Sequence, residues 1–167
     1  TSPFLTNSRV SGSTRKWSGG SPLPAGHSSR HARSAGCSCA RSPGPSAVVD
    51  RGFATYTNEA KMDMLGVGVG TLANFGAVSR QTALQMAHGA LFRSRADFAV
   101  AVTGIAGPGG GSSEKPVGLV HLAAKARNGQ SLHKEMHYGD IGRTEIRLAT
   151  VKTALEMLTA LNQAGSA

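Results

Sequence analysis

Two short, continuously apolar runs flank a glycine-rich segment in the second half of the chain. Residues 98–103 and residues 117–124 have the length and composition of buried strands. Residues 131–138 alternate between apolar and polar positions, which predicts a third strand. The glycine-rich segment, residues 103–118, therefore lies at a strand end, where loop backbone can approach a bound anion while the sheet holds both ends of the loop.

Apolar spacing of three and four residues, together with capping residues, predicts four helices around these strands. The first follows Thr57 and is closed by Gly66, and Ser79 caps the third. The last carries an apolar stripe, with Leu155 among its members, that we expect to pack on the sheet. The predicted helices span residues 58–65, 71–76, 80–94 and 144–163, after a strand-like stretch at residues 47–56.

Residues 1–46 differ in composition from the rest of the chain. They contain six Lys and Arg side chains and no Asp or Glu, so they carry six of the nine net positive charges. They show no helical or strand periodicity, and such a segment cannot bury enough apolar surface to offset its chain entropy. The sequence pI of about 10.4 describes this segment, so we do not expect the whole molecule to bind nucleic acid. DNA binding driven by residues 1–46 alone is an alternative that deleting them would test.

The cysteine pattern and the hydropathy pattern narrow the class of protein further. The two cysteines, Cys37 and Cys39, are too close for an ordinary disulfide, so a disulfide-stapled secreted domain is not indicated. No apolar run approaches the length of a membrane span, and residues 1–46 lack the apolar core of a secretory signal. Their Arg- and Ser-rich composition is compatible with a transit peptide. We expect a cytoplasmic protein without membrane contact.

Three polar clusters fall at the ends of the predicted elements, and the first contains Lys61. A lysine one turn into a helix has its pKa lowered when it is partly buried, and it then suits the role of general base for a nucleophilic hydroxyl. Tyr56 lies close to it in sequence. The alternative is an ordinary surface lysine near an exposed helix start, and the residues alone leave both open.

The other two clusters offer groups that can hold an anion. Residues 103–115 can present main-chain amides, with Lys115 adding charge. A strand follows these glycines, whereas the P-loop and Rossmann patterns both require a helix there. The third cluster supplies Arg143 and Arg147, which either pair with a carboxylate or phosphate or belong to a solvated first helical turn.

Two histidine-containing groups resemble metal ligands only weakly. His133 and His137 share a face of the third predicted strand, but no carboxylate or thiol cluster completes a site, so a solvated strand face is favoured. In residues 27–39, two histidines precede a Cys-x-Cys pair, which is a poor match to zinc-ligand spacing and has no second shell. We therefore expect no metal and no cofactor.

Three motifs occur in order along the chain and together carry a family resemblance. They are Phe53-Ala-Thr-Tyr-Thr-Asn-Glu-Ala-Lys61, Gly76-Ala-Val-Ser79 and Thr103-Gly-Ile-Ala-Gly-Pro-Gly-Gly-Gly-Ser-Ser-Glu-Lys-Pro-Val-Gly118. In this order and spacing they closely resemble the C-terminal domain of the CinA family, the competence/damage-inducible proteins, whose stand-alone members are nicotinamide-nucleotide amidohydrolases. The resemblance runs from about Pro43 to Leu161.

The resemblance implies a three-layer α/β/α domain that hydrolyses the amide of nicotinamide mononucleotide, yielding nicotinic acid mononucleotide and ammonia without a metal. This is a reaction of pyridine nucleotide salvage. In the family a serine in a T-A-E-S-C-T-G-G motif is the nucleophile, and Lys61 inherits the role of its base, with Tyr56 as a supporting catalytic residue. A homo-oligomer is compatible with the resemblance. The implied substrate-binding residues are Asn58, Thr103, Gly104, Ile105, Ala106, Gly107, Gly109, Lys115 and Arg147.

The sequence departs from the family pattern at the nucleophile and near the last helix. The T-A-E-S-C-T-G-G motif does not occur in it, and Ser38, in Gly36-Cys-Ser-Cys39, lacks the T-G-G that should follow. The family's G-D-R becomes Gly139-Asp-Ile-Gly-Arg143, which loosens the assignment of Arg147.

We interpret residues 1–42 as a disordered segment or as an out-of-frame translation, because acid-free composition gives way abruptly to family sequence. Residues 43–164 form the expected domain, without the family's first strand and helix. Resequencing the gene decides whether a frame shift restores the serine motif. A non-catalytic nucleotide-binding or regulatory module, linked to competence or DNA damage, is the alternative function.

Overall fold

The computed structural model describes residues 48–164. Several sequence-based expectations fall outside this range: the disordered or out-of-frame interpretation of residues 1–42, the assessment of Ser38, and the weak metal motif at residues 27–39.

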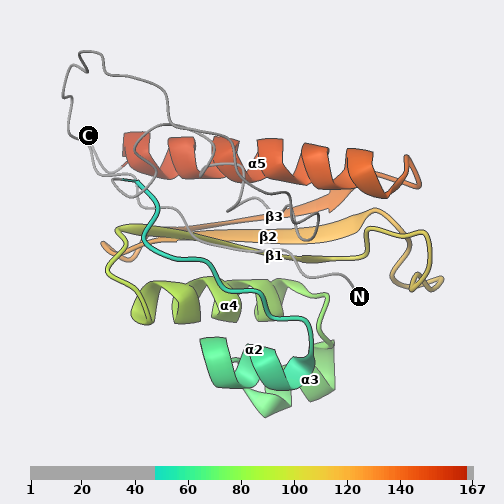
Figure 1. Cartoon of the computed structure of the whole chain (residues 1–167), viewed down its shortest axis with the longest axis horizontal. Helices are drawn as coiled ribbons and strands as arrows, with labels where there is room; N and C mark the ends of the chain where they lie inside the picture. Colours follow the sequence, from blue (N-terminus) through green and yellow to red (C-terminus); the bar gives the residue numbers. More distant parts are fainter. Residues whose placement is uncertain (1–47, 165–167) are drawn as a thin grey trace, which may run out of the picture.

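The described residues form three layers, with helices on both faces of an antiparallel sheet (Figure 1). The strand order is β1-β2-β3, so each strand pairs with its neighbour in the chain. Helix α4 covers one face and α5 covers the other, while α2 and α3 pack on the outer side of α4 (Figure 1). This confirms the expected α/β/α layering. The elements are α2 (Asn58–Leu65), α3 (Val69–Phe75), α4 (Arg80–Phe92), β1 (Phe98–Gly104), β2 (Leu119–Ala126), β3 (Ser131–His137) and α5 (Arg143–Ala164).

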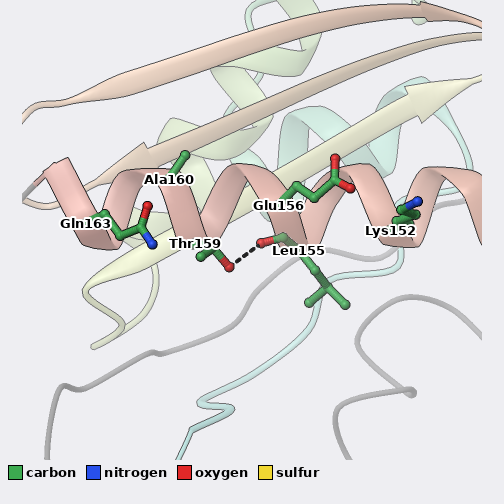
Figure 2. Close-up of a pocket in the computed structure, with 6 residues that line it drawn as sticks. All are labelled: Lys152, Leu155, Glu156, Thr159, Ala160 and Gln163. Atoms are coloured by element: carbon green, nitrogen blue, oxygen red, sulfur yellow. Dashed lines mark hydrogen bonds between the residues drawn. The ribbon is translucent and has the colours of Figure 1, made fainter.

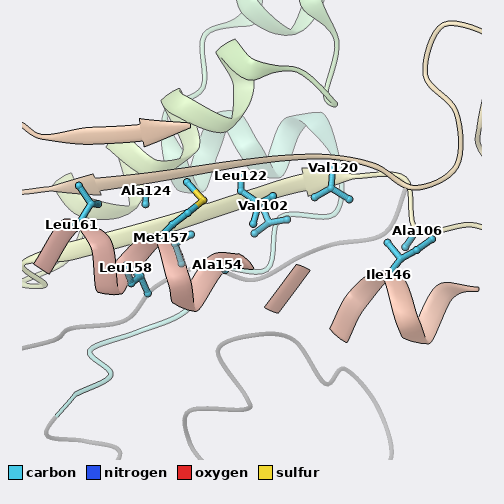
Figure 3. Packing of buried hydrophobic residues seen from close by; sticks show 11 residues of the cluster. Val102, Ala106, Val120, Leu122, Ala124, Ile146, Ala154, Met157, Leu158 and Leu161 are labelled. Atoms are coloured by element: carbon cyan, nitrogen blue, oxygen red, sulfur yellow. The ribbon is translucent and has the colours of Figure 1, made fainter. Parts of the chain in front are cut away.

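The two faces of the sheet carry side chains of different size. On the α5 face, Val102 of β1 lies opposite Leu122 of β2, and both belong to one core cluster with Met157 and Ile146 of α5, in which Ile146 lies further along the helix, beside Ala106 (Figure 3). Each of these five side chains is at most 2% exposed. Strand alternation puts successive residues on opposite faces, so branched and long residues at every second position define this face as the larger core.

The face towards α4 is lined by alanines. Ala99 and Ala101 of β1 and Ala123 of β2 lie there, against a helix surface that is itself rich in small residues. Such small side chains let the backbone of α4 approach the sheet closely. Gly89 on α4 extends this packing to the next layer, because a Cβ at that position would overlap the carbonyl oxygen of Leu65 in α2.

Side-chain caps set the starts of α2 and α4, as the sequence predicted. The hydroxyl oxygen of Thr57 accepts from the backbone N–H of Ala60 at 3.1 Å, and that of Ser79 accepts from Thr82 at 3.2 Å. Gly66 closes α2 in the left-handed region, with φ of 68°.

The strand-like interpretation of residues 47–56 is wrong for the described part of that stretch. It makes a single bridge, at Phe53, and no ladder with the sheet. Side chains anchor it instead: the Arg51 guanidinium donates to the carbonyl oxygen of Arg93 at 2.8 Å, and the Asp50 carboxylate accepts from the backbone N–H of Arg95 at 3.1 Å. The charged residues in the middle of this stretch interrupt the apolar run that suggested a strand.

The apolar stripe predicted for α5 is confirmed at Ala154, Leu158 and Leu161, which are buried, and is wrong at Leu155. Leu155 is 45% exposed, while Thr150 and Thr153 are buried on the face that packs on the sheet. Helical geometry explains the error, because a residue adjacent to buried Ala154 lies about 100° further round the helix. Threonine occupies the inner face because its hydroxyl can donate to a carbonyl four residues earlier, as Thr150 does to Ile146 at 2.6 Å.

The glycine-rich segment connects β1 to β2 and is closed by two backbone hydrogen bonds at its base. Ile105 donates to Leu119 at 2.9 Å, and Gly118 donates to Ile105 at 2.8 Å. Gly118 has φ of 89°, and a Cβ there would overlap the backbone of Gly139. Glycine is therefore required where the loop rejoins the sheet.

The close contact between α2 and α4 predicts a large asymmetry between two glycine-to-alanine substitutions. Gly89→Ala should lower the free energy of unfolding by about 1–3 kcal/mol or more, because its methyl group overlaps the Leu65 carbonyl. Gly70→Ala in α3 meets nothing within 4 Å and should be neutral or stabilising by up to about 1 kcal/mol. Urea unfolding of both variants measures the difference, and equal stabilities would contradict the packing described.

Candidate active site

Lys61 is a buried side chain whose amine donates hydrogen bonds to backbone carbonyl oxygens. It is 5% exposed, and its Nζ donates to the backbone oxygens of Thr55, Tyr56 and Thr57 at 3.2, 3.5 and 3.4 Å. The surface-lysine alternative is therefore wrong. Burial lowers the pKa of Lys61, and the carboxylate of Glu59 opposes that shift more weakly. An amine in this setting gives up its proton more readily than a solvated lysine does.

Thr55 lies beside this amine, and its sequence position gave no sign of a role. It is 2% exposed, and its hydroxyl makes no hydrogen bond; it is the one buried side-chain polar atom without a partner in residues 48–164. Leaving a buried hydroxyl unpaired costs about 1–3 kcal/mol relative to a paired one. Nothing in the local sequence signals this, since a threonine in an extended segment looks ordinary.

Tyr56 and Asn58 stand at the solvent-exposed start of α2. The Tyr56 side chain is 60% exposed and Asn58 is the first residue of the helix. The backbone of Tyr56 contacts the Lys61 amine, but its ring does not lie in the buried interior. The side chains of both residues are thus exposed, and only the backbone of Tyr56 contacts Lys61.

The first part of the glycine loop is buried and tied to the layer of α3 and α4. Thr103 is 6% exposed and donates through its hydroxyl to the carbonyl oxygen of Ala77, between α3 and α4, at 2.7 Å. Ile105 and Ala106 are also buried, and a Cβ at Gly104 would meet Val120 at 2.8 Å. These residues form a rigid wall, and their side chains face the protein interior.

The second part of the loop is exposed. Gly107 has φ of 70°, precedes a cis peptide bond to Pro108, and its carbonyl oxygen accepts from the Arg143 guanidinium at 3.1 Å. Gly109 lies in the exposed tip, with nothing within 4 Å of a Cβ built on it. The free amides of this tip are the part of the loop that a ligand can reach.

Lys115 and Arg147 occupy different electrostatic settings. The Lys115 amine donates to the carbonyl oxygen of Phe75, at the C-terminus of α3, at 2.8 Å, where a cation is favoured by the helix dipole. Arg147 is half-buried on the first turns of α5 and makes no hydrogen bond or ion pair within residues 48–164. Arg147 can therefore bind an anion without losing an existing hydrogen bond, whereas Lys115 cannot.

The structure thus joins the second and third predicted clusters and leaves the first separate. The loop contacts the α3–α4 region through Thr103 and Lys115, and the start of α5 through Arg143. No hydrogen bond among the described residues links Lys61 to the loop. Lys61 is connected to it only indirectly, through the packing of α2 on α4.

His121 of β2 and His133 of β3 form a partly buried pair on the α4 side of the sheet. Glu135 and His137, which share that face of β3, are exposed, as expected for a solvated strand face. His121 is 7% exposed, and its Nδ1 lies 3.3 Å from Nε2 of His133, with the rings stacked 5.5 Å apart. Glu135 lies opposite His121 in the ladder and accepts from His137 at 2.9 Å. The apolar run of β2 concealed His121 from sequence analysis.

Burial lowers the pKa values of both His121 and His133. Charges around them modify this effect: Glu135 opposes it for both, while Lys115 strengthens it for His121 and Arg80 for His133. Two imidazoles this close share one hydrogen bond only if at least one is neutral, because two protonated rings would offer donors alone.

A shallow hollow on the outer face of α5 lies away from these groups (Figure 2). Its volume is about 380 Å³. All the described residues that line it come from one helix, and one hydrogen bond within it joins the Thr159 hydroxyl to the Leu155 carbonyl at 2.9 Å (Figure 2). It has no convergent set of polar groups, so it is not a candidate for an active site.

Metal-ligand clusters and membrane-spanning helices are both absent from the described part of the chain. Residues 48–164 contain no group of three or more His, Cys, Asp or Glu side chains arranged to hold a metal ion. No helix within this range has the length and apolar character needed to cross a membrane.

Comparison with known proteins identifies relatives over most of the chain. Residues 34–161 match the model of the CinA C-terminal domain, starting somewhat before Pro43, where the motifs indicated. A protein described as competence-damage inducible, from Caldicellulosiruptor saccharolyticus, is 51% identical over 116 residues; the match covers 70% of this chain and 28% of that protein. The nicotinamide-nucleotide amidohydrolase PncC of Escherichia coli K12 is 48% identical over 116 residues, and the match covers 69% of each chain.

A solved structure matches as well. The crystal structure of the competence/damage inducible protein CihA from Agrobacterium tumefaciens superposes with a TM-score of 0.73 at 82% identity, covering 74% of both chains. The described fold is therefore that of a known group of α/β proteins.

The buried histidine pair predicts a loss of stability on mild acidification. The pKa values of His121 and His133 in the folded chain lie below the value near 6.5 of an unfolded chain. As the pH falls below about 6.5, the unfolded chain therefore binds more protons than the folded chain, which favours unfolding. The free energy of unfolding should fall by at most about 1.4 kcal/mol per pH unit for each histidine. His121→Gln should flatten this slope in urea unfolding between pH 7 and pH 5, where His88→Gln, at an exposed position on α4, should not. An unchanged slope for His121→Gln would refute the assignment.

Proposed function

This chain belongs to the CinA C-terminal domain family, and we propose that its domain is a nicotinamide-nucleotide amidohydrolase in which Lys61 is the catalytic base. Relatives named as such amidohydrolases support the reaction class. The observation that carries the proposal is the buried Lys61 amine, which has carbonyl oxygens as its hydrogen-bond partners and a lowered pKa. The substrate proposed is nicotinamide mononucleotide.

The proposed reaction follows from what a neutral lysine can do. Lys61 Nζ accepts the proton of a serine hydroxyl, and the serine oxygen attacks the carboxamide carbon. The resulting oxyanion is stabilised by backbone amides. The amide nitrogen takes the proton back from Lys61 and leaves as ammonia, and water then hydrolyses the acyl-serine ester to nicotinic acid mononucleotide. One water is consumed and one ammonia released.

The glycine loop is proposed as one wall of the nucleotide site. Its buried half, Thr103 to Ala106, fixes the shape of the wall, and the exposed backbone from Gly107 to Gly109 faces solvent, where an anion can approach. Arg147, which has no partner in the described range, is proposed to pair with the phosphate, and Asn58, at the start of α2, is proposed as a further polar contact to the substrate. Lys115 would act by holding the loop against α3.

The serine nucleophile is the element that this sequence does not supply, because the T-A-E-S-C-T-G-G motif is absent from it. We therefore propose that activity depends on a segment that carries this motif. The non-catalytic module is the competing function, favoured by the same absence.

Ammonia release from nicotinamide mononucleotide tests the proposal. The unaltered chain should bind the nucleotide without turnover, and a version in which residues 1–42 are replaced by a family segment carrying the motif should release ammonia. Within that active version, Lys61→Met should lower kcat by roughly 10²–10⁴-fold, the range for removal of a general base. Lys152→Met, at an exposed position on α5, should leave kcat unchanged.

Binding without turnover in the motif-restored chain would favour the non-catalytic module. Turnover that survives Lys61→Met would remove the base role from this residue.

A further inference from the structure

The hydroxyl of Thr55 is a buried polar group that makes no hydrogen bond. A valine has nearly the same shape and would remove the unpaired hydroxyl, so packing alone does not call for threonine here. A buried polar group without a partner is expected to be rare and to have a reason. The surroundings of Thr55 indicate what that reason is.

Thr55 is the residue whose backbone holds the Lys61 amine most closely. Its carbonyl oxygen is the nearest of the three acceptors, at 3.2 Å, and both residues are at most 5% exposed. The remaining two contacts are longer, at 3.4 and 3.5 Å. The unpaired hydroxyl therefore belongs to the residue in closest contact with the amine.

Carbonyl oxygens can satisfy only one of the two states of a lysine. The charged ammonium has three N–H donors and no lone pair, so three acceptors suit it. The neutral amine has a lone pair that only a donor can satisfy. Among the neighbouring side chains, the Thr57 hydroxyl caps α2 and the Tyr56 side chain is exposed. The Thr55 hydroxyl is buried and makes no hydrogen bond, including to the Lys61 amine, so a rotation about χ1 is needed to bring it to the lone pair.

We propose that Thr55 is a positioning residue for Lys61: its hydroxyl donates a hydrogen bond to the lone pair of the neutral amine and holds it in the base form until the nucleophile's hydroxyl replaces it. This proposal rests on the base role of Lys61 proposed above. No proton changes owner in this step, since only the donor to the lone pair is exchanged. The unpaired hydroxyl then lowers the stability of the fold, and its role in positioning Lys61 explains why it is kept.

The test follows the titration of Lys61 by NMR in the full chain labelled with [ε-¹³C]lysine, with the Lys61 signal assigned by its loss in Lys61→Arg. Thr55→Val should raise the pKa of Lys61 by about one unit, which is the size expected for one hydrogen bond lost from the neutral form. Thr55→Ser, which keeps the hydroxyl, should retain the original midpoint. At a pH at which Lys61 is charged, Thr55→Val should also raise Tm, because the hydroxyl that it removes has no partner in that state.

Thr150→Val is the matched control. Thr150 is equally buried, but its hydroxyl is paired with the Ile146 carbonyl at 2.6 Å on the other side of the sheet. It should lower Tm and leave the Lys61 titration unchanged. If Thr55→Val does not fold, Thr55→Ala removes the same hydroxyl without strain.

A Lys61 pKa that stays the same or falls in the Thr55 variants would overturn the proposal, as would a fall in Tm equal to that of Thr150→Val. Neither readout uses nicotinamide mononucleotide. A failure of the amidohydrolase proposal would therefore appear as absent ammonia release from the motif-restored chain, with the Lys61 titration still responding to Thr55.

Discussion

The inequality between the two faces of the sheet is the constraint on which the rest of the structure depends. Valine and leucine fill the α5 face, while alanines line the other, so α4 can lie close to the strands. Gly89 then allows α2 to pack directly on α4. Because α2 carries Lys61, and the segment before α4 accepts the Thr103 hydroxyl bond, this close packing fixes the positions of both halves of the candidate site.

The two halves use backbone groups in opposite ways. Around Lys61, carbonyl oxygens from three successive residues converge on a buried amine. At the tip of the glycine loop, amides are left exposed and the carbonyl of Gly107 is already occupied by Arg143. Backbone arranged in this manner costs no side-chain entropy, so a small domain can build the proposed anion-facing wall and the proposed base with few dedicated side chains. Burial lowers the pKa of Lys61 and so makes it chemically distinct from a surface lysine.

The sequence predicted the elements well because their signals are local. The caps at Thr57 and Ser79, the alternation in β3 and the apolar runs of β1 and β2 each depend on neighbouring residues, and their elements are present within a few residues of the predicted bounds. The predictions that Leu155 is buried and that residues 47–56 form a strand were wrong, because distant partners determine the orientation of a helix and the pairing of a strand. Three features could not be predicted from neighbouring residues, because they arise where separate layers of the fold pack together. They are the burial of Lys61, the unpaired Thr55 hydroxyl and the His121–His133 contact.

The central proposal is that Lys61 and the glycine loop share one nucleotide site. The most direct test is a ¹H–¹⁵N NMR titration with nicotinamide mononucleotide, in which amide chemical-shift changes locate the bound nucleotide on the chain. We expect saturable shifts at Lys61 and its neighbours in α2 and, with the same dissociation constant, at Gly107 and Gly109. Shifts confined to the outer face of α5 around Leu155, or different dissociation constants for the two regions, would contradict it.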